Sequence, residues 1–212
     1  MAEGLRERKK RQTRQHLSDV ATGLFLQRGF DAVTIAEIAD AADVSVNTVY
    51  NYFPAKEDLF FDRSKGIVDR LPRCVRARAE GESAAAAVLR ELRREVETGS
   101  PDLGLIDGYA DFMRVVMEAH TLRSRLCAIQ QEVVQRLEET LRAETGAADG
   151  DPLPTLMAGQ LAWIQSALMG WIGAEMVKGR KAGDVSRGAL ALLDDMAGML
   201  GEQVLKYAVR EG

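Results

Sequence analysis

The sequence has few of the residues that build disulfide-bonded or metal-binding proteins. Its 212 residues include two cysteines and two histidines. Cys74 and Cys127 match no disulfide framework and no zinc-ligand spacing, so we expect a reduced, cytoplasmic setting. No apolar run approaches the roughly 20 residues that span a bilayer. The charged segment Met1–Arg14 lacks the apolar core of a secretory signal.

Signatures of catalysis are also missing. The chain has no glycine-rich phosphate loop, no HExxH motif and no nucleophile elbow. The acidic pairs Asp194–Asp195 and Glu138–Glu139 are adjacent in sequence, and adjacent side chains point apart on a helix. We therefore predict a protein that is not an enzyme and that needs no cofactor or metal.

Strand signals are nearly absent, because the chain shows no sustained apolar–polar alternation and no Asn-Gly hairpin turn. Helical periodicity runs almost from end to end, which predicts an all-α fold. Apolar residues make up 46% and charged residues 28%, as in an ordinary globular protein. The net charge of −4 argues against a wholly basic surface, but a local basic patch is sufficient for DNA binding.

The first 55 residues predict three helices with clear boundaries. An apolar stripe marks the first helix, which stops at Gly29; the stripe comprises Leu17, Val20, Ala21, Leu24 and Phe25. Thr34 and Glu37 form a capping box for a short second helix. After a tight turn at Asp43-Val44, Ser45 caps a third helix over residues 46–53, which Pro54 ends.

Two short helices joined by a tight turn and packed on a longer one are typical of a DNA-binding helix-turn-helix. Val49 and Phe53 would dock the third helix on the other two. The opposite face would carry polar groups for bases and phosphates, namely Asn47, Thr48, Asn51 and Tyr52. Lys56 opens the next helix, where its charge and the free backbone amides favour a phosphate. A solvated amphipathic helix pair would show the same periodicity.

The segment from Gly29 to Phe60 resembles the DNA-binding domain of the TetR family of transcriptional regulators. The family pattern is found at Leu24-Phe25, Gly29-Phe30, Thr34, Ile38-Ala39, Val44-Ser45, Thr48, Tyr50, Tyr52-Phe53 and Lys56-Glu57-Asp58-Leu59. The match covers about 50 residues, whereas the rest of the chain resembles the family only in length and helical content.

This resemblance implies a function for individual residues. Thr34, Tyr52 and Lys56 would bind phosphates. Four residues would face the major groove, namely Ser45, Asn47, Thr48 and Tyr50. The family pattern also turns Val46 toward the bases, whereas periodicity puts it in the core, and the sequence leaves this open. Asp43 replaces a usual glycine but tolerates left-handed backbone angles, and Asn47 replaces a common glycine, which should alter base preference.

The N-terminal segment concentrates basic charge. Its six basic residues are Arg6, Arg8, Lys9, Lys10, Arg11 and Arg14, against two glutamates. Alone, such a segment would be a solvated tail. Beside a helix-turn-helix, we expect it to follow phosphates or enter the minor groove.

The remainder predicts a second, regulatory domain over residues 56–212, after a DNA-binding domain over 1–55. Its expected helices cover about 55–79, interrupted at Pro72, then 83–98, 102–119, 122–144, 153–179 and 185–209. The last two have broad apolar faces, with glycines that allow close approach. The resemblance implies that they pair with a second copy in a four-helix bundle, and a homodimer suits palindromic operator DNA.

Aromatic and methionine side chains predict an adaptable pocket for a small, largely apolar effector. The candidate residues are Tyr109, Phe112, Met113, Met117, His120, Gln131, Trp163 and Met169. A filled core would look similar, so two interpretations stay open. The first is a repressor released by this effector, and the alternative is a DNA-binding regulator controlled by a protein partner without a small-molecule ligand.

Overall fold

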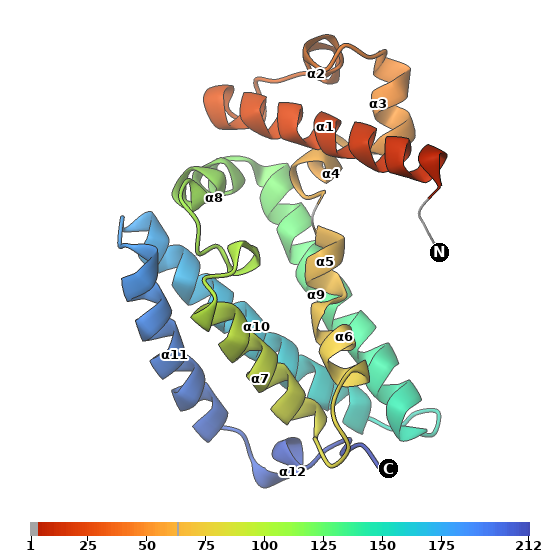
Figure 1. Cartoon of the computed structure of the whole chain (residues 1–212), viewed down its shortest axis with the longest axis vertical. Helices are drawn as coiled ribbons and strands as arrows, with labels where there is room; N and C mark the ends of the chain where they lie inside the picture. Colours follow the sequence, from red (N-terminus) through yellow and green to blue (C-terminus); the bar gives the residue numbers. More distant parts are fainter. Residues whose placement is uncertain (1–3, 63) are drawn as a thin grey trace. The chain divides into compact units, whose positions relative to one another are not determined.

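The computed structural model describes residues 4–62 and 64–212, and these ranges contain helices and no strand (Figure 1). The prediction of an all-α fold is confirmed. The chain forms two compact units. The first comprises Met1–Arg63 with Arg114–Arg125, and the second comprises Ser64–Met113 with Leu126–Gly212. The division therefore falls after Arg63, eight residues beyond the domain boundary expected from the sequence.

The first unit contains the three predicted N-terminal helices and one short helix after them. These are α1 (Leu5–Arg28), α2 (Ile35–Ala41), α3 (Val46–Tyr52) and α4 (Lys56–Phe60). Leu17, Ala21 and Phe25 on the inner face of α1 are fully buried. The Phe25 ring lies 4.9 Å from Phe30 and 5.8 Å from Phe60, centroid to centroid. This aromatic cluster fixes α4 and the α1–α2 connection against α1.

The predicted helix starts are confirmed. The Thr34 side chain accepts a hydrogen bond from the Glu37 N–H, and Glu37 accepts one from the Thr34 N–H, which completes the capping box. Ser45 caps α3 by accepting from the Thr48 N–H. Asp43 adopts the left-handed conformation expected of the turn, with φ of 54°. Local hydrogen bonding therefore sets where the two short helices begin.

The second unit is built from α5 to α12. Its helices are α5 (Ser64–Val68), α6 (Arg70–Arg76), α7 (Ala84–Glu97), the 3₁₀ helix η1 (Pro101–Leu103), α8 (Tyr109–Glu118), α9 (His120–Thr145), α10 (Leu153–Val177), α11 (Ala182–Gly198) and α12 (Glu202–Leu205). The end of α8 and the start of α9 belong to the first unit. Within the two described ranges, no helix is both long and apolar enough to cross a membrane.

Three predicted helices were wrong in extent. The helix expected over 55–79 is three short helices, and Pro72 lies in the first turn of α6, where its missing N–H has no intrahelical partner to lose. The helix expected over 102–119 begins only at Tyr109. Gly104 and Gly108 have φ of 85° and 83°, which a helix cannot contain. The helix expected over 185–209 ends at Gly198, and α12 follows separately.

The helix α10 packs against α7 and α11. Ile164, Leu168 and Ile172 on its inner face are fully buried. The α10–α11 contact is close because Gly188 has no side chain: a Cβ there would lie 2.4 Å from Trp171. This packing turns the opposite side of α10 outward.

Candidate nucleic-acid interface

The outer face of α3 carries the side chains predicted to read DNA. Val49 and Phe53 are fully buried and attach the helix to the core, as predicted. Asn47 and Asn51 are exposed, and Tyr50 is 50% exposed. Val46 is 42% exposed, so the structure places it on this outer face rather than in the core. The face therefore offers amide, aromatic and apolar groups to a partner.

Thr48 and Ser45 act together at the start of α3. Their hydroxyl oxygens lie 2.8 Å apart, and the Ser45 Oγ also accepts from the Thr48 N–H at 3.0 Å. Ser45 is exposed and Thr48 is half-buried. The cap thus holds the Thr48 hydroxyl in a fixed position at the end of the helix that the sequence predicts to enter the groove.

Thr34, predicted to bind phosphate, is exposed and part of the capping box. Its Oγ1 donates to Glu37 Oε2 at 2.8 Å, and Arg28 donates to Glu37 Oε1 at 2.7 Å. The hydrogen bond from the Thr34 backbone, followed by that from Arg28, lowers the pKa of Glu37 to about 2. Glu37 therefore stays ionised at neutral pH and keeps α2 capped.

Lys56 makes contacts within the first unit that the sequence did not indicate. Its Nζ donates to the carbonyl oxygens of Phe30 and Val33 at 2.9 and 3.0 Å. It also lies 4.1 Å from the centroid of the Phe30 ring, within the range of a cation–π contact. The ammonium group thus fastens the α1–α2 connection to the start of α4.

Arg14 also makes hydrogen bonds within the first unit. Its Nε donates to Asp62 Oδ1 at 2.6 Å, and its Nη1 donates to the Tyr52 carbonyl oxygen at 2.7 Å. The guanidinium lies 4.2 Å from the centroid of the Phe53 ring. Arg14 therefore joins α1 to the last turn of α3 and fixes how α3 is presented.

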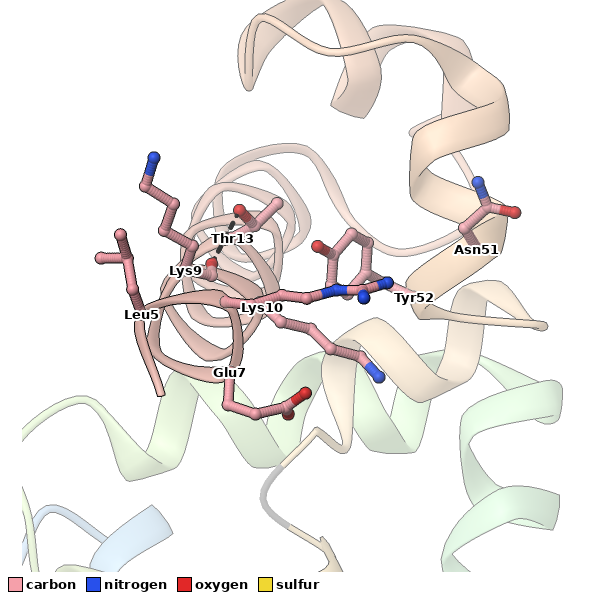
Figure 2. Close-up of a pocket in the computed structure, with 8 residues that line it drawn as sticks. Leu5, Glu7, Lys9, Lys10, Thr13, Asn51 and Tyr52 are labelled. Carbon is pink, nitrogen blue, oxygen red and sulfur yellow. Dashed lines mark hydrogen bonds between the residues drawn. The ribbon is translucent and has the colours of Figure 1, made fainter. Parts of the chain in front are cut away.

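An open cleft of about 780 Å³ lies between the first turns of α1 and the end of α3 (Figure 2). It is lined by Leu5, Arg6, Glu7, Lys9, Lys10, Thr13, Asn51 and Tyr52. The basic segment predicted as a tail or arm is helical from Leu5 onward. Arg6, Lys9, Lys10 and Thr13 recur at helical spacing, so they share one side of α1. The cleft was not predicted from the sequence, although the helical spacing of these four residues could have indicated it.

The candidate effector residues divide by exposure. Met117, His120, Gln131 and Trp163 are exposed, whereas Tyr109, Phe112, Met113 and Met169 are half-buried. The rings of Tyr109 and Phe112 stack with centroids 6.1 Å apart. Met117 and His120 belong to the first unit, and the other six belong to the second. The half-buried group is the better candidate for contact with a small molecule.

Removing the Lys56 ammonium should destabilise the first unit. We expect Lys56→Met to lower the free energy of unfolding by about 1–2 kcal/mol, because two carbonyl groups lose a charged donor. Chemical denaturation measures this, with the exposed Lys181→Met as control. The salt dependence of DNA binding should not change. A shallower salt dependence with normal stability would instead assign Lys56 to a phosphate.

Known proteins resemble the chain most clearly in this interface. Residues 17–62 match the profile described as "Bacterial regulatory proteins, tetR family". The HTH-type transcriptional regulator TcmR of Streptomyces glaucescens is 29% identical over 148 residues, which cover 68% of this chain and 65% of the relative. The HTH-type transcriptional regulator AcrR of Shigella flexneri is 37% identical over 84 residues, 38% of either protein. The chain thus spans less than two thirds of the length of each relative.

Solved structures share the fold over most of the chain. NalD, the secondary repressor of the MexAB-OprM multidrug efflux pump in Pseudomonas aeruginosa, matches with a TM-score of 0.60 and 18% identity. That match covers 91% of this chain and 98% of NalD. A SmeT–triclosan complex matches with a TM-score of 0.59 and 17% identity, over 91% and 93% of the two chains. With the predicted motif, the capped α2 and α3 and this profile match, the N-terminal helix-turn-helix over residues 17–62 is similar to that of the tetR family of bacterial regulatory proteins.

Proposed function

We propose that the protein is a transcriptional repressor that binds palindromic operator DNA as a homodimer and is released by a small, largely apolar effector. The proposal depends mainly on the outer face of α3. This face carries side chains that can contact bases, and it borders a cleft lined by basic residues. Asn47 can form two hydrogen bonds with adenine, and Val46 can contact a thymine methyl group. Lys9, Lys10 and Tyr52 in the adjoining cleft suit phosphates.

A homodimer is supported by a stripe on α10, here called the α10 seam, in which every member except the half-buried Ala167 is exposed. It comprises Leu153, Leu156, Gln160, Trp163, Ala167, Gly170, Ala174 and Val177. Successive members alternate three and four residues apart, the spacing of helices that pack along a shared seam. Leu156, Trp163 and Val177 are each 56% exposed. Exposed apolar side chains in this register favour burial against a second copy.

Dimerisation would set the distance between the two α3 helices that bind DNA. Each protomer has one α3, and two copies related by a twofold axis match the two halves of a palindrome. The two α3 helices must then lie about 34–36 Å apart, or a further helical turn apart, to enter successive major grooves on one side of the duplex. An effector that changes this separation would weaken binding.

An effector is supported by the half-buried Tyr109, Phe112, Met113 and Met169. A protein with this fold, SmeT, was solved as a complex with triclosan. Linkage requires that an effector and operator DNA weaken each other's binding by the same factor. A coupling of about 1–3 kcal/mol corresponds to roughly 5–150-fold release. Failure of every lipophilic compound in a thermal-shift screen would favour control by a protein partner.

Two substitutions on the DNA-binding face separate sequence reading from phosphate binding. We expect Asn47→Ala to lower the ratio of operator to random-DNA affinity by about 10-fold or more, because a base contact is lost from each protomer. Tyr52→Ala should weaken both affinities by a similar factor, since phosphates carry no sequence information. Fluorescence anisotropy with the two DNAs measures both. Equal losses on both DNAs for Asn47→Ala would contradict its base-reading function.

A further inference from the structure

A buried polar cluster lies in the second unit, away from the DNA-binding face. Arg70 on α6 is 2% exposed, and its Nε lies 3.4 Å from Glu95 Oε1 on α7. Its Nη2 donates to the Asp102 carbonyl oxygen at 3.2 Å. Its Nη1 is 3.9 Å from the Met169 Sδ on α10, a weak acceptor. Arg70 therefore links α6, α7, η1 and α10.

Two buried acceptor atoms of the second unit lack donors, one on Glu95 beside this guanidinium and one on Gln165 of α10. Glu95 Oε2 and Gln165 Oε1 are buried without a hydrogen-bond partner in the described part of the chain. Glu95 is 6% exposed and Gln165 is 2% exposed. Gln165 lies one helical turn before Met169, so both face the same side of α10. Buried polar atoms are almost always paired, and leaving two unpaired is costly.

Half-buried aromatic side chains pack on this side of α10, beyond Met169 along the helix. Gly173 lies one turn beyond Met169, and a Cβ at Gly173 would be 3.2 Å from the Tyr109 ring. The same ring covers Gly104, where a Cβ would lie 2.6 Å away. Phe112 stacks on Tyr109. The Tyr109 ring therefore packs on α10 at Gly173, eight residues beyond Gln165.

We propose that Arg70, Glu95 and Gln165 form the polar end of the effector site and that the effector is an aromatic molecule with hydroxyl groups. This inference rests on the proposed function. A hydroxyl group fits because it donates to an unpaired oxygen and accepts from the Arg70 Nη1. The aromatic part suits Tyr109, Phe112 and Met169.

The charges of the cluster select a neutral effector. Arg70 and Glu95 already form a buried ion pair, so a charged effector would add a buried charge without a partner. The unpaired Glu95 and Gln165 oxygens also disfavour a carboxylate or phosphate. Burial raises the pKa of the Glu95 carboxyl, although Arg70 opposes this effect. Two uncharged hydroxyl donors, one for each oxygen, would satisfy both without adding a buried charge.

The test measures binding of two probes, dihydroxynaphthalene and its dimethyl ether, to the chain of 212 residues. They share an aromatic frame, but only the diol has O–H donors. By calorimetry we expect the diol to bind at least about 10-fold more tightly, because a site built for hydroxyl groups rejects an analogue without them. Equal affinities, or no binding of the diol, would overturn the proposal.

Gln165→Met tests the assigned oxygen, because methionine keeps the side-chain length and removes the acceptor. We expect diol affinity to fall about 10-fold with the ether unchanged, and the melting temperature of the free protein to rise by about 2–4 °C. The exposed Gln130→Met should change neither affinity. Glu95→Gln, which keeps the shape, should also weaken the diol selectively. Unchanged diol affinity in the folded variants would refute the assignment.

DNA binding measured on the same samples separates this inference from the proposed function. Operator binding with no preference for the diol would refute only the hydroxyl-recognition site. Selective diol binding by a protein that does not distinguish operator from random DNA would refute only the proposed repressor function.

Discussion

Trp163→Glu is expected to convert the dimer into a monomer and to weaken operator binding by about 100-fold or more. Trp163 is 56% exposed near the middle of the α10 seam, beside the small residues Ala167 and Gly170. A glutamate there would bury two like charges against each other across the twofold axis. Separate monomers would lose the advantage of binding two half-sites at once, which is worth about 100-fold or more.

Sedimentation and DNA titration measure the two effects separately. Gln130→Glu is the matched control, because it adds the same charge on an exposed part of α9 in the same unit. The control should remain dimeric and bind operator normally. If Trp163→Glu stayed dimeric at micromolar concentration, the α10 seam would not be the interface.

Replacing Arg6, Lys9 and Lys10 together by glutamine is expected to weaken binding to every DNA sequence by about 100-fold or more. These side chains line the cleft beside Asn51 and Tyr52. A dimer would lose six phosphate contacts, and each contact contributes about 0.9 to the slope of log K against log salt. The slope should therefore become shallower by about 5.

The control for this variant removes the same charge elsewhere. Arg90, Arg94 and Arg136 are each more than half exposed on the second unit. Their ion pairs are on the surface, where such pairs contribute little to stability. Their replacement by glutamine should leave the salt slope unchanged. A similar loss in both triple variants would mean that overall charge, rather than the cleft, attracts DNA.

Local signals in the sequence were sufficient for the helix-turn-helix. The hydroxyl of Thr34, the carboxylate of Glu37 and the hydroxyl of Ser45 act within three residues of their partners, so spacing alone locates the helix starts. Asp43 could be assigned to the turn because its side chain tolerates positive φ. The buried face of α3 followed from periodicity, since Val49 and Phe53 are four residues apart.

Long-range contacts could not be predicted in this way. The sequence shows that Lys56 and Arg14 are cations near a DNA-binding motif, but their partners Phe30, Val33 and Asp62 are 23 to 48 residues away. The sequence does not distinguish a cation that donates to a carbonyl oxygen of the protein from a cation that is free to bind a phosphate. The buried Arg70–Glu95 pair was missed for the same reason.

The α10 helix shows a related limit. Trp163 and Ile164 belong to one apolar stretch, and the sequence predicts Trp163 as an effector-binding residue. In the structure Ile164 is fully buried and Trp163 is exposed. A helix that is apolar on both sides has no polar face to mark its orientation, so the assignment of Trp163 to an effector pocket had no independent support.

Sequence-specific DNA binding is tested by the affinity of the protein for DNA from its own chromosomal neighbourhood, compared with random DNA of the same length and composition. At physiological salt, a specific regulator should prefer one palindromic segment by about 1,000-fold or more. Asn47→Ala should reduce that preference. Equal affinity for all fragments, with the same salt dependence, would contradict specific operator binding and would leave only nonspecific attraction to phosphates.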